Sequence, residues 1–142
     1  MTNLDTTTTS YQYNDVRFIN ALTAYVDENA NTFSSWTYDA QERATGTQEA
    51  GGAFAATLAY NSNGSVTDTD ALGAVRTFTY SRLADVNKVT SISGSQCLTC
   101  QESAATTYDS SGFVSSRTDY NGNLTCYAND PVRGLELGES DQ

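Results

Sequence analysis

The sequence contains no histidine, and this absence narrows the chemistry that the 142-residue chain can perform. Histidine is the usual proton shuttle near neutral pH and the commonest metal ligand. Nucleophile systems that pair serine or cysteine with histidine are therefore excluded within this chain. We expect a protein that is not an enzyme and that uses no cofactor.

Positive charge is also scarce, because 7 Lys and Arg stand against 17 Asp and Glu, giving a formal net charge of −10. A negative surface repels phosphate backbones and anionic lipid headgroups, which argues against nucleic-acid and membrane-surface partners. No apolar run approaches the roughly 18–20 residues of a membrane-spanning helix, so we expect no membrane span. No signal peptide is visible, since the first residues lack a basic start and an apolar stretch.

Proline occurs once, and the helix formers Lys, Glu and Leu are few. The chain instead carries nine Tyr, five Phe and one Trp, together with many Thr and Val. Aromatic and β-branched side chains pack well across the strands of a half-buried sheet. The composition therefore predicts an all-β protein in which ten glycines mark tight turns.

The chain repeats itself when it is aligned on a tyrosine followed by a small polar residue. Successive copies begin at Tyr13, Tyr38, Tyr60, Tyr80 and Tyr108, with a looser sixth copy at Tyr127. Self-similarity at intervals of 20–30 residues is typical of repeated supersecondary units, each too small to bury its own apolar face.

Each copy that matches the pattern closely contains two turns that end in glycine. Asn61 and Gly64 fit the first and fourth positions of a type I turn, and a second turn ends at Gly73. Gly112 and Gly122 end the same two turns in the later copy. Each copy is thus predicted to be two short antiparallel strands joined by turns.

Two earlier turns carry Ala30 and Glu42 where the later copies have glycine. Side chains with a Cβ resist the positive φ that glycine adopts readily. We therefore expect these two turns either to open differently or to store strain.

The pattern Tyr-Asp-x-x-Gly, Asp-x-x-Gly and x-Tyr-x-Tyr resembles the YD repeat of RHS (rearrangement hotspot) proteins. It covers residues 11 to about 137, most closely at 60–81 and 108–130. The resemblance implies tandem antiparallel β-hairpins that form a twisted or spiral sheet. In large family members this sheet encloses a toxic or signalling C-terminal segment. The roughly six repeats of this chain are too few to enclose such a segment. The Asp130-Pro131 pair is interpreted as a turn.

This resemblance divides the chain into a polar Thr-rich arm (1–10), about six YD-type repeats (11–137) and an acidic C-terminal tail (138–142). The expected repeat anchors are Tyr13, Tyr38, Asp39, Tyr60, Asn61, Gly64, Gly73, Tyr80, Tyr108, Asp109, Gly112, Gly122 and Tyr127.

Three cysteines, Cys97, Cys100 and Cys126, leave several interpretations open. A structural zinc site usually has four ligands, and three cysteines without histidine fall one short. A thioredoxin-like pair would need a βαβ context. We favour unpaired thiols or a disulfide, either between Cys97 and Cys100 or from one of them to Cys126, because an extracellular repeat protein lies in an oxidising compartment.

Acidic clusters and aromatic residues each allow a binding role and a structural one. The acidic clusters could suggest calcium, but they lack the EF-hand spacing, and we interpret them as solvated turn carboxylates: Asp27 with Glu28, Asp68 with Asp70, and Asp119 with Asn121 and Asn123. The tyrosines and Trp36 could stack against sugars, although regular spacing favours cross-strand packing.

A short spiral of strands leaves an unpaired edge at each end, where one copy could pair with the next. We expect a structural protein, located extracellularly or at the cell surface, that assembles with itself into a filament or tube. The expected donor strand is the arm made of Thr6, Thr7, Thr8, Thr9, Tyr11 and Tyr13. Alternatives are a shell or adhesin fragment that binds surface glycans and, third, a carboxylate- or thiol-based enzyme.

Overall fold

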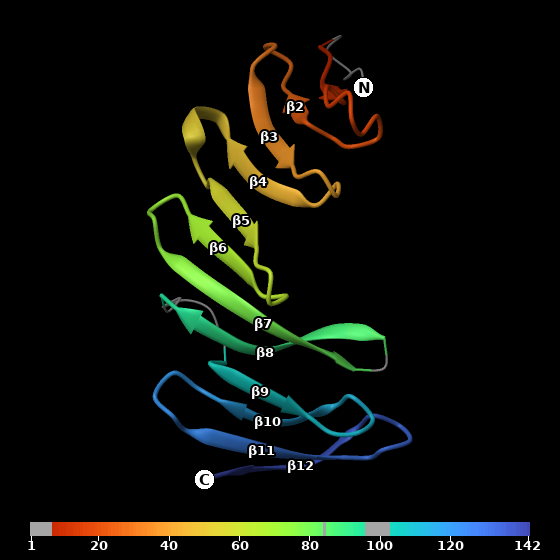
Figure 1. Cartoon of the computed structure of the whole chain (residues 1–142), viewed down its shortest axis with the longest axis vertical. Coiled ribbons are helices and arrows are strands. Elements are labelled where there is room, and N and C mark those ends of the chain that lie inside the picture. Colours follow the sequence, from red (N-terminus) through yellow and green to blue (C-terminus); the bar gives the residue numbers. More distant parts are fainter. Residues whose placement is uncertain (1–6, 84, 96–102) are drawn as a thin grey trace. The chain divides into compact units, whose positions relative to one another are not determined.

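A computed structural model describes residues 7–83, 85–95 and 103–142, which form twelve β-strands and no α-helix (Figure 1). The prediction of an all-β chain is confirmed. The chain divides into two compact units, Met1–Ala59 with Asp68–Ala74 and Tyr60–Thr67 with Val75–Gln142. Within the described residues, no helix is both long and apolar enough to span a membrane.

The first unit is an antiparallel ladder in which each strand pairs with the next one in the chain. Its strands are β1 (Ser10–Gln12), β2 (Ala24–Val26), β3 (Thr32–Tyr38), β4 (Ala44–Glu49) and β5 (Ala56–Tyr60). A short 3₁₀ turn, Ala50–Gly52, follows β4. The next strand, β6 (Val66–Asp70), is divided between the two units.

The second unit continues the same hairpin pattern, and Figure 1 shows its strands side by side in chain order. They are β7 (Val75–Leu83), β8 (Val86–Gly94), β9 (Ala105–Tyr108), β10 (Val114–Thr118), β11 (Leu124–Asn129) and β12 (Glu136–Asp141). All of these pairings are antiparallel.

A single turn geometry recurs between the strands. The N–H of its first residue donates to the carbonyl four positions on, and the N–H of the fourth residue donates back to the first carbonyl. This is the expected bonding of a hairpin loop whose type I turn ends in a left-handed residue. Among the described residues, turns of this kind begin at Asp27, Asp39, Asn61, Asp70, Asp109 and Asp119.

The carboxylate oxygen of aspartate explains why this residue occupies the first position of most of these turns. Asp109 Oδ1 accepts the N–H groups of Ser111 (2.9 Å) and Phe113 (3.0 Å), and Asp119 Oδ1 does the same for Asn121 and Asn123. The carboxylate thus satisfies two donors that the turned backbone cannot pair with carbonyls. The local sequence, rather than distant packing, fixes each loop.

Ala30 and Glu42 adopt the glycine geometry instead of opening their turns. Their φ angles are 64° and 61°, close to the left-handed angles of Gly64 and Gly112 at the same turn position. Non-glycine residues pay for this conformation with a clash between Cβ and the carbonyl oxygen. Of the two outcomes expected for these turns, the structure shows the strained one.

Strands near both ends of the described chain belong to the ladder. Residues 138–141, expected in a tail, belong to β12, where Ser140 pairs with Cys126 of β11. At the other end, Ser10–Gln12, which includes Tyr11 of the expected donor strand, pairs with β2 of the same chain. Backbone N–H and C=O groups at each end join the ladder because pairing satisfies them.

The first copy of the repeat also departs from the others. Tyr13 is 51% exposed and lies in the loop after β1. The turn in this loop begins at Asp15, whose carbonyl accepts the N–H of Phe18 at 3.0 Å. Tyr13 therefore does not directly precede a hairpin turn, as Tyr38, Tyr60 and Tyr108 do. The other later anchors, Tyr80 and Tyr127, lie inside strands β7 and β11.

Burial is slight throughout the ladder. Among the described residues only Ala21, Ala24, Val26, Ser65 and Gly112 are buried, and no large side chain is fully buried. Hydrogen-bonded ladders and cross-strand contacts therefore contribute much of what holds the described strands together.

We predict that Ala30→Gly and Glu42→Gly each raise the free energy of unfolding by about 0.5–1 kcal/mol, because glycine removes the left-handed penalty. The reciprocal control is Gly64→Ala, which places a Cβ in open space at φ 83° and should cost about 1 kcal/mol. Urea denaturation followed by circular dichroism measures all three. Destabilisation by Ala30→Gly would contradict the strain assignment.

Candidate functional site

The outer edge of β12 presents backbone groups that β11 does not use. Gln142 donates its N–H to the Leu124 carbonyl at 2.9 Å, so Gln142 faces β11. Backbone direction alternates along an antiparallel strand, so Ser140 and Gly138 also face β11, whereas Glu139 and Asp141 face outward. In the part of the chain that the structure describes, β12 pairs only with β11.

The short strand β1 exposes a similar edge. The Gln12 carbonyl accepts the N–H of Thr23 at 2.8 Å, which turns Gln12 toward β2. By the same alternation, the N–H and C=O of Tyr11 point away from β2. Among the described strands, β2 alone pairs with β1.

The two edges differ in charge. All six residues of β12 are exposed, and Glu136, Glu139 and Asp141 make the strand acidic. Strand β1 has the sequence Ser-Tyr-Gln and carries no charge. Like charges placed opposite each other destabilise strand pairing, so two β12 edges are poor partners for each other.

The anchor tyrosines of the later copies pack within the ladder. Tyr38 donates its hydroxyl to the Leu22 carbonyl at 2.7 Å, and Tyr108 donates to the Val89 carbonyl at 2.8 Å. Lys88 also lies 5.1 Å from the Tyr108 ring centre, within cation–π range. The other later anchors, Tyr60, Tyr80 and Tyr127, are half-buried.

The turn carboxylates are engaged locally. Asp119 accepts hydrogen bonds from the side-chain and backbone N–H groups of Asn123 and from the backbone of Asn121, which together lower its pKa. Within the described ranges, no group of three or more Asp, Glu or Cys side chains is placed to hold a metal ion. The turn aspartates thus act on their own backbone.

Of the cysteines, Cys126 is a half-buried free thiol on β11. Cys97 and Cys100 lie outside the described residues, as does Thr6 of the expected arm. The disulfide prediction stays a prediction.

A pocket of about 480 Å³ lies beside Trp36 in the first unit. Arg17 crosses its wall, donating to Asp15 Oδ1 at 2.9 Å and Oδ2 at 2.6 Å and to the Tyr38 carbonyl at 3.1 Å. The hydrogen bonds from Arg17 lower the pKa of Asp15, and Asp15 in turn raises the pKa of Arg17. The pocket combines an aromatic side chain with a fixed, internally neutralised ion pair.

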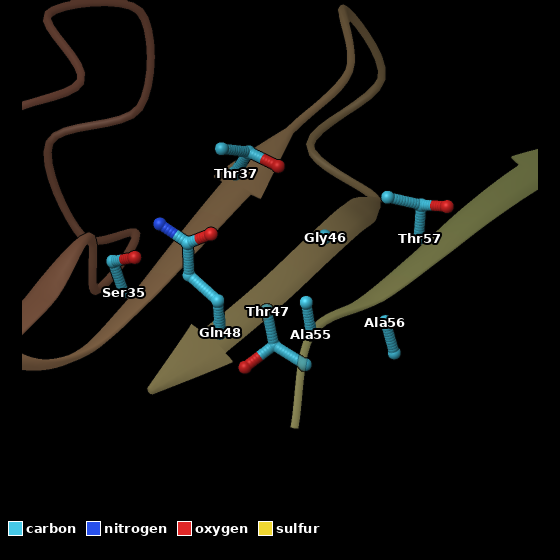
Figure 2. Close-up of a pocket in the computed structure, with 8 residues that line it drawn as sticks. All are labelled: Ser35, Thr37, Gly46, Thr47, Gln48, Ala55, Ala56 and Thr57. Carbon is cyan, nitrogen blue, oxygen red and sulfur yellow. The ribbon is translucent and has the colours of Figure 1, made fainter. Parts of the chain in front are cut away.

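A smaller hollow of about 220 Å³ lies on β3, β4 and residues 55–57, and Figure 2 shows its lining. Gly46 keeps it open, because a Cβ there would lie 2.8 Å from Thr37 Oγ1. Its other side chains are Ala, Ser, Thr and Gln. They offer hydrogen bonds but no group for acid–base catalysis.

No protein-family model matches the chain, and the comparison with curated proteins gave no match either. Its role must therefore be inferred from its own residues and geometry.

We predict that Arg17→Gln raises the pKa of Asp15 toward its ordinary value of 3.8. Since the folded pKa lies below the unfolded one, the Arg17 interaction stabilises the chain above about pH 4 and is lost as pH falls through the folded pKa. Carboxyl-carbon NMR titration measures the change. Arg82→Gln, which breaks an exposed ion pair in the other unit, should leave Asp15 unaltered. An unchanged Asp15 titration in Arg17→Gln would contradict the assignment.

Proposed function

We propose that the chain is a non-enzymatic structural protein that assembles head-to-tail through β-strand pairing into an extracellular filament or tube. The observation that carries this proposal is the set of outward backbone groups of Glu139 and Asp141 on β12 and of Tyr11 on β1. Unpaired edges of this kind are templates for strand addition.

The difference in charge between the edges supports a head-to-tail arrangement. Acidic β12 meets less repulsion from uncharged β1 than from another β12. Each contact would use two different surfaces and so leave a fresh edge at both ends. Contacts of this type extend into filaments when the rotation between copies does not close a ring.

The low burial of the ladder supports the same role. A sheet that buries few side chains gains from every added strand, because each addition pairs backbone groups and covers half-exposed neighbours. The YD-like anchors and turn aspartates fit a scaffold of stacked hairpins, and membership of the RHS type is part of this proposal.

The test is the variant Glu139→Pro. Proline removes the outward N–H of residue 139 without removing a bond to β11, and edge strands tolerate it. We expect its association constant to fall about tenfold, since one backbone hydrogen bond is worth about 0.5–1.5 kcal/mol and the ring adds a clash. Sedimentation velocity across a concentration series, with negative-stain images, measures this.

The matched control is Glu139→Thr, which also removes the carboxylate but keeps the N–H. It should assemble at least as well as the native chain because edge repulsion is reduced. Circular dichroism verifies that both variants fold. A native chain that stays monomeric at every concentration would defeat the proposal.

A second candidate function is that of a glycan-binding fragment of an RHS-type shell or adhesin, and the Trp36 pocket favours it. Aromatic rings stack on the apolar faces of sugars, and Asn14, Thr23 and the Asp15–Arg17 pair offer hydrogen bonds to hydroxyl groups. The neutralised ion pair in an acidic chain favours an uncharged saccharide.

For this candidate we expect Trp36→Ala to weaken binding of a neutral glycan about tenfold or more, because it removes the stacking surface. A glycan array followed by calorimetry measures the effect. Phe33→Ala, which alters an exposed aromatic on the same strand outside the pocket, should retain binding. A native chain that binds no glycan, or equal losses in both variants, would exclude this function.

A further inference from the structure

Tyr11 and Tyr25 face each other across the first two strands. They are direct partners in the β1–β2 register. The outward direction of the Tyr11 backbone makes this a pair without mutual hydrogen bonds, in which the Cα atoms approach to about 4.5 Å and side chains lie closest. The ring centres are 5.4 Å apart and the rings are inclined by 37°.

Both phenols are within reach of solvent species. Tyr11 is 56% exposed, and Tyr25 is half-buried. Tyr25 also makes an edge-to-face contact with Phe33, whose ring centre lies 6.0 Å from that of Tyr25 at an interplanar angle of 79°. Phe33 has no hydroxyl and forms no phenoxyl radical, so within this trio Tyr25 has one coupling partner, Tyr11.

We propose that Tyr11 and Tyr25 form an oxidative modification site, at which a peroxidase-type oxidant joins their rings into an intrachain dityrosine. Each phenol gives up one electron and one proton to hydrogen peroxide, which is reduced to two molecules of water. The two phenoxyl radicals combine at carbons ortho to oxygen, forming one C–C bond. The hydrogen on each of these carbons moves to oxygen and restores both phenols.

Geometry favours this pair over encounters between molecules. An exposed side chain such as Tyr11 changes rotamer within picoseconds to nanoseconds, so the ortho carbons of the two neighbouring rings meet often. Holding reactants together raises their effective concentration far above that of separate chains. The product links β1 covalently to β2 through the two side chains. The outward backbone N–H and C=O groups of Tyr11 are unchanged, so this modification site does not depend on the proposed assembly.

The experiment treats the full chain with peroxidase and limiting hydrogen peroxide at low protein concentration. Trypsin cuts after Arg17, between the two tyrosines, and next after Arg43. We expect peptides 1–17 and 18–43 to be recovered as one species that has lost two hydrogens, with fragmentation placing the link at Tyr11 and Tyr25. Dityrosine fluorescence should appear in the monomer band of a denaturing gel.

Matched variants test the assignment. Tyr11→Phe and Tyr25→Phe should each lower the yield of monomer-band dityrosine about tenfold or more, because each removes one of the two positioned phenols. Tyr13→Phe is the control: Tyr13 is also exposed, and its ring contacts no other aromatic ring among the described residues. Its yield should stay within about twofold of the native value.

Three results would overturn the proposal. They are a link at other tyrosines, an equal loss in Tyr13→Phe, and a yield that falls in proportion to protein concentration. Circular dichroism shows whether each variant is folded, and the native chain in denaturant should lose the selectivity for this pair. Sedimentation of the untreated chain reports on assembly separately, so failure here and failure of the proposed function are distinguishable.

Discussion

The fold depends on one interaction, the capture of backbone N–H groups by a side-chain oxygen within each turn. The carboxylate of an opening aspartate provides this oxygen in most of the described turns, and in the Asn61 turn the Asn63 side chain accepts the N–H of Ser65 instead. Asp109 and Asp119 each bind two such groups, and the turned backbone closes with a residue in the left-handed region. The loop then has one length, and the flanking strands have one register. Interruptions of the register lie beside several turns, as between Tyr25 and Val26 or Ala128 and Asn129, so the loops also set where the ladder is irregular.

Local control of this kind explains why the chain forms regular strands while burying so little. A protein with a large core chooses its register by hiding one face of each strand. Here only five small or β-branched residues are buried in the described ranges, so that selection is weak. Turn chemistry takes its place, and tyrosines such as Tyr38 and Tyr108 add a fixed contact by bonding to a neighbouring backbone carbonyl.

The parts of the fold that the sequence could predict are those determined by adjacent residues. The all-β class and the turns at Asn61 and Asp119 follow from side chains within five positions. The ends could not be predicted this way, because whether Gly138–Asp141 forms a tail or a strand depends on the free edge of β11, which no local pattern reports. The pocket beside Trp36 was missed for the same reason, since Arg17 reaches it from a loop 19 residues earlier.

Strain at Ala30 shows what the turn motif can impose. Its φ of 64° costs about 1–2 kcal/mol, yet the loop keeps its form because the Asp27 carboxylate binds the N–H groups of Asn29 and Asn31. The hydrogen bonds of the carboxylate therefore stabilise this turn even where the residue at positive φ is not glycine. Repeats can therefore diverge at the glycine and still stack, provided that a side-chain oxygen within the turn accepts backbone N–H groups, as Asn63 does in the Asn61 turn. In such a chain the side-chain acceptor is the constrained feature, and the residue at the glycine position adjusts the stability of each hairpin.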